Sequence, residues 1–215
     1  VMHRAIKGTP KTAIIKRTPT GKWFVSISVE ETEKHGQAKR LPASEEAVGV
    51  DVGLKTFAYL STNEDIANPR FFREEETKLA RAQRQFAKAP KGSKKREDKR
   101  KVIARTHERI ANRRKNFIEQ EVSKLVARFG FIAVEALVVR NLVKNPKRAK
   151  SIADASWSMF FTRLQAKAEE AGRQVVRVNP AYTSQTCSAC GHRQPMPPLW
   201  SGDPPRPQWE PQYLN

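Results

Sequence analysis

Hydrophobic and polar residues alternate in several short segments of the chain, and this alternation predicts β-strands. Residues 13–29 contain two such segments around a Thr-Pro-Thr-Gly turn, which predicts a β-hairpin. Residues 48–54 place valine and leucine on one face, whereas Gly49, Asp51 and Gly53 share the other face. A carboxylate therefore sits among glycines in a strand that otherwise suits a core. Shorter apolar runs predict further strands over residues 57–60, 131–135 and 175–178.

Residues 70–116 are predicted to form a helical hairpin, because the Ala-Pro-Lys-Gly-Ser sequence at positions 89–93 would break a helix. In the second arm, apolar residues recur every seven positions and predict one packed face. This helix is expected to continue to Phe129 and to end at Gly130, which would serve as its C-cap.

The chain beyond residue 140 is expected to continue as loop, helix and strand. Residues 141–150 are predicted to form a basic loop. Asp154 or Ser156 is expected to cap the next helix, and Gly172 is expected to end it. The aromatic residues of that helix keep helical spacing, so we assign them to a core and not to base stacking. The order of strands and helices predicts an α/β fold.

The charge of the chain changes this picture more than its apolar content does. Among 215 residues, 41 are Lys or Arg and 22 are Asp or Glu, which gives a net charge of +19. A polyanionic partner follows as the first hypothesis. No apolar run is long enough to span a membrane, and no terminal segment pairs an apolar face with a basic one. We therefore expect a cytoplasmic protein that binds nucleic acid and not membrane.

Much of the positive charge lies in the predicted helical hairpin, where 18 residues are Lys or Arg and 6 are Asp or Glu. A stripe about 18 Å long recurs every four residues along the second arm: Lys101, Arg105, Arg109 and Arg113. A charge run is usually a solvated helix face. The excess of one sign favours phosphate contacts instead, since a merely solvated helix mixes Glu with Lys.

Asp51 and Glu135 each lie near the end of a predicted apolar strand, where α/β sheets bind ligands. Two carboxylates brought together there would repel each other unless a cation lay between them, and paired divalent ions cleave phosphodiesters. A Mg²⁺ or Mn²⁺ nuclease site is one interpretation. The other is that Asp51 merely ends a strand and Glu135 is a surface residue. Gly49 and Gly53 favour the first, since small residues let a phosphate backbone approach.

Cys187 and Cys190 are the only cysteines of the chain, and their Cys-x-x-Cys spacing followed by Gly191 is typical of a zinc knuckle. Zinc needs four ligands, and His192 is too close in sequence for easy geometry. A second chain could complete the site. Two free thiols are the alternative.

Several motifs occur in the order seen in the TnpB family, the OrfB accessory transposases of insertion sequences, which are kin to type V CRISPR effectors. The sequence resembles this family over about residues 10–194, and the resemblance rests on residues 48–55, 109–116, 132–135, 154–161 and 182–191.

The resemblance implies an RNase H-like (RuvC) nuclease domain, a guide RNA and a DNA target. Asp51 and Glu135 look like the first two catalytic carboxylates, which would bind Mg²⁺ or Mn²⁺. Cys187 and Cys190 look like the first half of a zinc-ribbon site. The hairpin of residues 13–29 is similar to the end of a β-rich wedge domain. The residues expected to bind nucleic acid are Lys101, Arg105, Arg109, Arg113 and Arg114.

The sequence also departs from the family pattern. A second Cys-x-x-Cys and a third catalytic Asp, in an Asp-Arg-Asp-x-Asn-Ala-Ala stretch, do not occur, and the context of Asp203 does not match. We therefore expect a protein truncated at both ends and impaired in cleavage. The alternative is a non-catalytic RNA- or DNA-binding remnant with a regulatory role.

The resulting domain prediction has six parts. They are a wedge remnant with a linker (1–43), a first RuvC-like part (44–68), a basic helical insertion (69–118), a second RuvC-like part (119–180), half a zinc-ribbon (181–194) and a proline-rich tail expected to be disordered (195–215).

Overall fold

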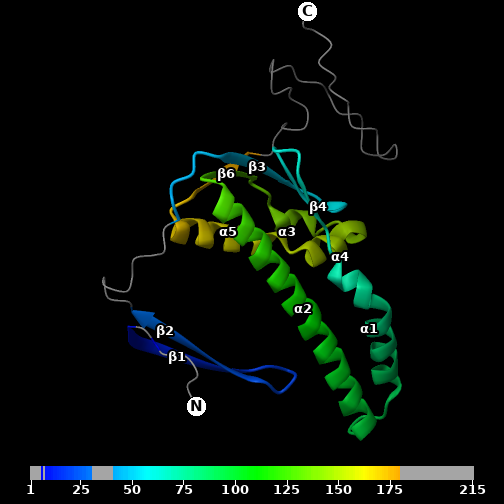
Figure 1. Cartoon of the computed structure of the whole chain (residues 1–215). Coiled ribbons are helices and arrows are strands. Elements are labelled where there is room, and N and C mark those ends of the chain that lie inside the picture. The colour runs from blue at the N-terminus through cyan, green and yellow to red at the C-terminus, as the bar shows by residue number, and fades with distance from the viewer. Residues whose placement is uncertain (1–5, 7, 31–40, 180–215) are drawn as a thin grey trace, which may run out of the picture. The chain divides into compact units, whose positions relative to one another are not determined.

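The computed structural model describes residues 6, 8–30 and 41–179 (Figure 1). It is a mixed α/β structure, as the sequence predicted. In chain order its elements are β1 (Thr9–Arg17), β2 (Trp23–Glu30), β3 (Ala47–Val52), β4 (Thr56–Leu60), β5 (Asp65–Ala67), α1 (Phe71–Lys88), α2 (Lys94–Arg128), β6 (Phe131–Glu135), α3 (Val139–Leu142), α4 (Pro146–Ala155), α5 (Trp157–Ala171) and β7 (Gln174–Val178).

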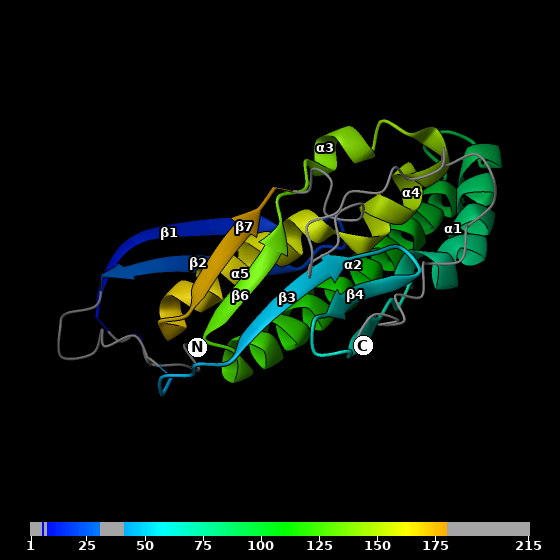
Figure 2. The ribbon, with the colours of Figure 1, turned by 90° about the horizontal axis from the view of Figure 1, so that it is seen from above.

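The central sheet of the described chain has five strands in the order β5-β4-β3-β6-β7 (Figure 2). β3, β4 and β5 follow one another as antiparallel neighbours. The chain then passes through α1 and α2 and returns to place β6 parallel to β3, on the side away from β4. After α5, β7 pairs in parallel with β6. The strand β5 was missed from the sequence, since three residues offer too little alternation to recognise.

One face of this sheet is buried against α2 and α5. The alternating valines Val48, Val50 and Val52 of β3 point into the core, as the pattern of residues 48–54 predicted. Phe57 of β4 is 1% exposed and packs edge-to-face on Phe160 of α5, with ring centroids 5.3 Å apart. The aromatic residues of α5 are therefore core residues, as predicted.

The helical hairpin is formed by α1 and α2, and the break falls where the sequence predicted it. Ser93 caps α2, because its side chain accepts a hydrogen bond from Arg96 N at 3.2 Å. Gly92 precedes it with φ of 80°, a conformation that favours glycine. Helix α2 then runs unbroken to Arg128, so a domain boundary at residue 118 would cut through a continuous helix.

Two predictions were wrong, one about the end of α2 and one about residues 141–150. Gly130 is not a left-handed C-cap, because α2 ends at Arg128 and Phe129 is already extended with φ of −102°. Glycine is needed at position 130 for close packing, since a Cβ there would lie 1.7 Å from Ser44 O. The expected basic loop over residues 141–150 is also helical in large part, since α3 ends within it and α4 begins within it. Gly172 does end α5, with φ of 71°.

The predicted hairpin of residues 13–29 is confirmed as β1 and β2. The two strands are antiparallel, with Ile15 opposite Val25. Gly21 in the connecting turn has φ of 89°, which fits the glycine at that position.

Candidate functional site

Asp51 and Glu135 are brought together by the pairing of two parallel strands. The register joins Val50 of β3 to Val134 of β6, so the next residue on each strand is Asp51 and Glu135. Val50 and Val134 are buried in the core. Because successive side chains of a strand point to opposite faces, both carboxylates lie on the sheet face that points away from α2 and α5. The two residues singled out from the sequence therefore share one face and one edge of the strand pair.

The two carboxylates interact electrostatically. The pKa of Glu135 is raised, first by partial burial and then by the negative charge of Asp51. Both effects penalise the ionised form of Glu135. A cation bound between the two groups would remove the repulsion, so the pair is suited to hold one.

The donor set fits a hard divalent cation such as Mg²⁺. Within residues 6, 8–30 and 41–179, no group of three or more His, Cys, Asp and Glu side chains is placed to hold a metal ion. Mg²⁺ is commonly held by one or two carboxylates together with waters and substrate phosphate oxygens. Asp51 and Glu135 can supply the protein part of such a site, and a phosphate substrate would supply the rest.

Tyr59 is a neighbour of this site that was not predicted from the sequence. It lies directly opposite Asp51 in the β3–β4 pair, and its hydroxyl accepts a hydrogen bond from Thr56 Oγ1 at 2.7 Å. Since cross-strand partners share a face, Tyr59 stands beside the carboxylates. The short connection between the two strands was the signal that could have found it, because loop length sets the register of a hairpin.

The glycines beside Asp51 have different roles. A Cβ at Gly53 would lie 3.0 Å from Thr56 O, so a side chain at this position would require the neighbouring backbone to shift. A Cβ at Gly49 would make only ordinary contact with Ser61, at 3.6 Å. Glycine at position 49 is thus not required by packing against the described residues, and it leaves the sheet face next to Asp51 without a side chain.

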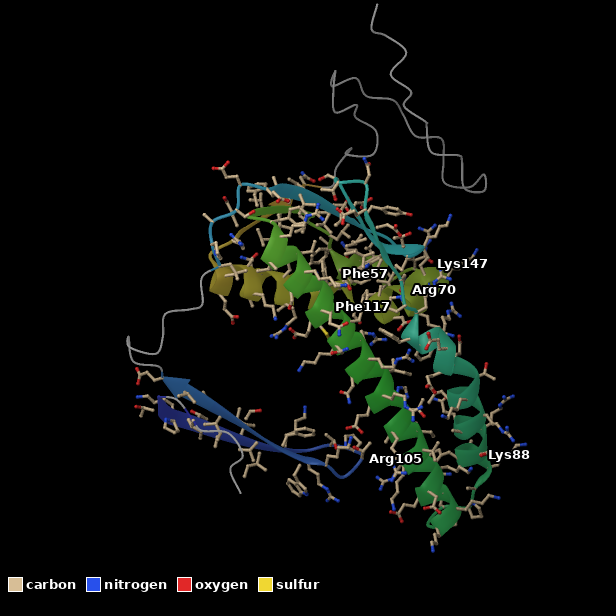
Figure 3. All side chains as sticks on the ribbon, in the orientation of Figure 1. Phe57, Arg70, Lys88, Arg105, Phe117 and Lys147 are labelled. Atoms are coloured by element: carbon tan, nitrogen blue, oxygen red, sulfur yellow. The ribbon has the colours of Figure 1, made fainter. Side chains whose placement is uncertain are left out.

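The basic stripe on α2 is largely engaged in ion pairs. Arg109 Nη1 lies 3.2 Å from Glu75 of α1, and Arg113 Nη1 lies 2.6 Å from Glu74. Lys101 is paired with Glu97 on its own helix at 3.1 Å, by an i, i+4 contact. Arg105 is the member of the stripe that is exposed and has no ion pair with the described residues (Figure 3). Neighbouring carboxylates therefore neutralise most of the stripe that was assigned to phosphates from the sequence.

Arg114 takes part in a largely buried ion pair. Its Nη2 lies 2.6 Å from Asp154 Oδ1, and the two side chains are 19% and 7% exposed. The same carboxylate accepts a hydrogen bond from Phe72 N at 3.1 Å, in the first turn of α1. Asp154 therefore caps α1, and the expectation that it caps the helix after it was wrong. Ser156 precedes α5 but makes no side-chain cap hydrogen bond.

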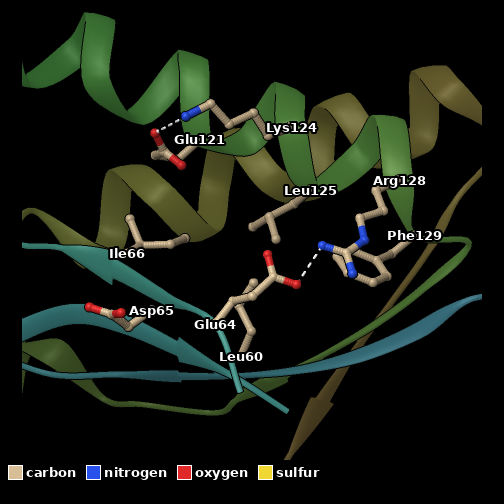
Figure 4. A pocket seen from close by; sticks show the side chains of 9 residues that line it. All are labelled: Leu60, Glu64, Asp65, Ile66, Glu121, Lys124, Leu125, Arg128 and Phe129. Atoms are coloured by element: carbon tan, nitrogen blue, oxygen red, sulfur yellow. Dashed lines mark hydrogen bonds and ion pairs between the residues drawn. The ribbon is translucent and has the colours of Figure 1, made fainter. Parts of the chain in front are cut away.

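A separate pocket of about 220 Å³ lies between the β4–β5 hairpin and the last turns of α2 (Figure 4). Four of the five charged side chains that line it are paired with each other: Arg128 contacts Glu64 at 2.6 Å, and Lys124 contacts Glu121 at 2.8 Å. The pKa of Glu64 is lowered, chiefly by the hydrogen bond from Arg128. The Arg128–Glu64 pair therefore links the edge of the sheet to α2, and the two ion pairs occupy most of the charged groups of the pocket.

Cys187 and Cys190, together with the proline-rich segment 195–215, lie outside the described residues. No helix in the described part of the chain is long and apolar enough to cross a membrane.

Comparison with known proteins identifies two family models in the chain. The OrfB_IS605 model, described as a probable transposase, matches residues 25–146. A model described as the Cas12f1-like TNB domain matches residues 157–209, which include both cysteines.

Two bacterial relatives agree with these models. A "Putative RNA-guided DNA endonuclease" from Streptomyces pristinaespiralis is 37% identical over 183 residues, which are 85% of this chain and 44% of the relative. InsQ of Escherichia coli (strain K12), which has the same designation, is 32% identical over 88% of this chain and 50% of its own length. The chain thus spans about half the length of these relatives.

The fold is also similar to that of a solved structure, a cryo-EM structure of a Cas12f1–sgRNA–target DNA complex. The TM-score is 0.55 with 20% sequence identity, and the match covers 84% of this chain and 38% of the other. The first family model alone covers more than half of the chain, and the resemblance seen in the sequence is confirmed: the protein belongs to the TnpB/OrfB (OrfB_IS605) transposase family.

Proposed function

We propose that residues 41–179 form the RNase H-like (RuvC) core of an RNA-guided DNA endonuclease, in which Asp51 and Glu135 hold a divalent cation. One observation carries the proposal: two carboxylates on neighbouring parallel strands share a sheet face, where burial and then the negative charge of Asp51 raise the pKa of Glu135. The names of the two relatives and the nucleic-acid complex of the similar structure support it.

The residues present would contribute positioning and charge. Asp51 and Glu135 would fix the cation at the end of the β3–β6 pair, and Gly49 leaves room for a phosphate backbone beside it. A bound Mg²⁺ would polarise a phosphoryl oxygen and lower the pKa of a bound water. A two-metal site uses more carboxylates than this pair, so we propose that the 215 residues by themselves cleave DNA slowly.

The proposed partners are a guide RNA and a DNA target, and the net charge of +19 supports binding to both. We also propose that Cys187 and Cys190 supply half of a zinc site, since they lie within the residues that match the TNB model. Zinc content measured before and after Cys187→Ser/Cys190→Ser substitution tests that part separately.

The test is cleavage of plasmid DNA by the purified chain with Mg²⁺ and RNA transcribed from its own locus. We expect slow cleavage that is lost in Asp51→Asn and in Glu135→Gln but kept in Asp98→Asn, an exposed carboxylate of α2. Cleavage that survives Asp51→Asn would contradict the assignment of the site. RNA binding without any cleavage would favour a non-catalytic binding protein instead.

A further inference from the structure

Residues 136–153 form a basic segment that begins directly after Glu135 and contains no acidic residue. It includes α3 and the greater part of α4. The exposed Arg140, Lys144, Lys147 and Arg148 have no ion pair with any described residue, whereas Lys150 is paired with Glu76. Four positive charges are therefore left without neutralisation next to the proposed catalytic strand.

This segment is anchored at both ends. Leu137 and Val139 pack against the core, and Ala136 N donates a hydrogen bond to Val178 O at 2.8 Å. At the other end, Ile152 is buried and Asp154 binds both Arg114 and the first turn of α1. The four cations are thus presented from a fixed surface, which we name the basic platform and define as residues 138–148.

Two charges of the basic platform, those of Lys147 and Arg148, do not stabilise the helix that contains them. Lys147 and Arg148 lie in the first turn of α4. That turn has no acidic residue, and the helix dipole disfavours cations there. In contrast, the cations of α2 reach carboxylates on α1 and on their own helix. A structural role therefore accounts for the paired cations of the stripe on α2 and does not account for Lys147 and Arg148 of the basic platform.

Apolar side chains are interleaved with these cations. Val138 is 56% exposed, and Leu142 and Val143 are also exposed. A nucleic-acid duplex keeps its base faces stacked and presents phosphates, sugars and the edges of bases to a protein surface. A single strand presents phosphates together with the faces of unstacked bases, which pack on apolar and aromatic groups. The mixture of charge and apolar surface therefore favours a single strand.

The chain connection limits the distance between this surface and the carboxylates. The Cα atom of Arg140 can lie no more than about 18 Å from that of Glu135, because Arg140 is the fifth residue after Glu135 and an extended residue spans at most roughly 3.6 Å. Figure 2 shows α3 beyond the tip of β6, the strand that ends at Glu135. We propose that the basic platform binds a single nucleic-acid strand and leads it to Asp51 and Glu135. Only the last step rests on the proposed function, since binding itself needs neither carboxylate.

The test is fluorescence anisotropy of a fluorescein-labelled thymidine oligonucleotide over a range of salt concentrations, in EDTA. The platform variant carries Arg140→Gln, Lys144→Gln, Lys147→Gln and Arg148→Gln. The control loses the same charge at the far tip of the helical hairpin, through Lys91→Gln, Lys94→Gln, Lys95→Gln and Lys99→Gln. Urea unfolding midpoints check that both variants fold.

We expect the platform variant to bind at least tenfold more weakly. The slope of log affinity against log salt should fall by about 2 to 3, since each phosphate contact to a single strand contributes roughly 0.7. The tip variant should lose less than half as much of the slope. Equal losses in both variants would show a general charge effect and would overturn the proposal.

A second variant tests the apolar contacts. Leu142→Ser/Val143→Ser should weaken binding to the oligonucleotide several-fold and leave binding to a duplex of the same length unchanged. Equal effects on both would contradict single-strand recognition. Wild-type binding to phosphatidylserine vesicles that is lost in the platform variant, with oligonucleotide binding unchanged, would instead assign the surface to a membrane.

Because EDTA removes divalent cations, these outcomes are separate from the cleavage test. Unchanged strand binding in the platform variant, with cleavage that depends on Asp51, would reject the platform and keep the nuclease. Weakened strand binding in the platform variant, with cleavage that is independent of Asp51, would keep the platform and reject the assignment of the nuclease site.

Discussion

Two regions of the chain are rich in Lys and Arg but differ in their surroundings. In the stripe on α2, Arg109 and Arg113 face Glu75 and Glu74 of α1 at 3.2 and 2.6 Å. In the basic platform, the four cations from Arg140 to Arg148 meet no carboxylate among the described residues. The count of Lys and Arg therefore does not show which cations the fold leaves without an ion pair. We propose that these unpaired cations are the ones that bind a polyanion.

Helix α2 also contributes one ion pair that is largely buried, between Arg114 and Asp154. We expect Asp154→Ala to destabilise the fold by about 2 to 4 kcal/mol, because it leaves a largely buried Arg114 unpaired and removes the cap of α1. Urea unfolding measures this loss, with the exposed Asp98→Ala as control. A loss below about 0.5 kcal/mol, like that of the control, would mean that Arg114 is free to bind other groups.

Removal of the carboxylates that pair with the stripe on α2 tests whether these ion pairs keep the stripe from binding nucleic acid. Glu74→Gln/Glu75→Gln should free Arg113 and Arg109, and should steepen the salt dependence of oligonucleotide binding by about 1.4 in slope. The cost in stability should be about 1 kcal/mol or less for the exposed Glu74 pair, and larger for the Glu75 pair, because the Glu75 side chain is only 13% exposed.

The control for this change is Glu169→Gln/Glu170→Gln on α5, which alters the net charge equally at exposed positions. If both variants gain the same affinity, the paired arginines are not being released. If neither gains any, the stripe on α2 does not face the nucleic acid.

The smallest expected effect is a change in the pKa of Glu135, whose negative charge is close to that of Asp51. The pKa of Glu135 is raised by burial and by Asp51, so Asp51→Asn should lower it by removing the second cause. A carboxyl group with a raised pKa destabilises the folded state once the pH exceeds its unfolded value, so Glu135→Gln should slightly raise the unfolding midpoint at neutral pH and have no such effect in acid.

Carboxyl carbon NMR of Glu135 follows its titration directly. A Glu135 titration that is the same in Asp51→Asn as in the wild type would mean that the two side chains are not neighbours. The exposed Asp98→Asn is again the control, since it changes the charge far along α2.

Much of the fold could be predicted from local pattern, because β3, β6 and α5 bury alternating or helically spaced apolar residues such as Val50, Val134 and Phe160. The positions of Asp51 and Glu135 in their strands were also readable, and strand order then made them neighbours. Contacts between distant segments were not readable. Nothing in the sequence near Asp154 indicates Phe72 or Arg114 as its partners.

The same limit explains why the ion pairs of the basic stripe could not be predicted from the sequence. Glu74 and Glu75 are distant in sequence from Arg113 and Arg109, so the ion pairs between the helices depend on how the hairpin packs. The need for glycine at position 130 comes from Ser44, which is equally remote in the chain. Periodicity predicts which face of an element is apolar, but it does not show which charges the fold will neutralise.

Mn²⁺ binding, followed by water proton relaxation, shows whether Asp51 and Glu135 hold one divalent cation together. We predict that Asp51→Asn and Glu135→Gln each weaken Mn²⁺ binding at least tenfold, that the double variant is little worse than either, and that Asp98→Asn is unchanged. Wild-type affinity for Mn²⁺ in the double variant would contradict the claim.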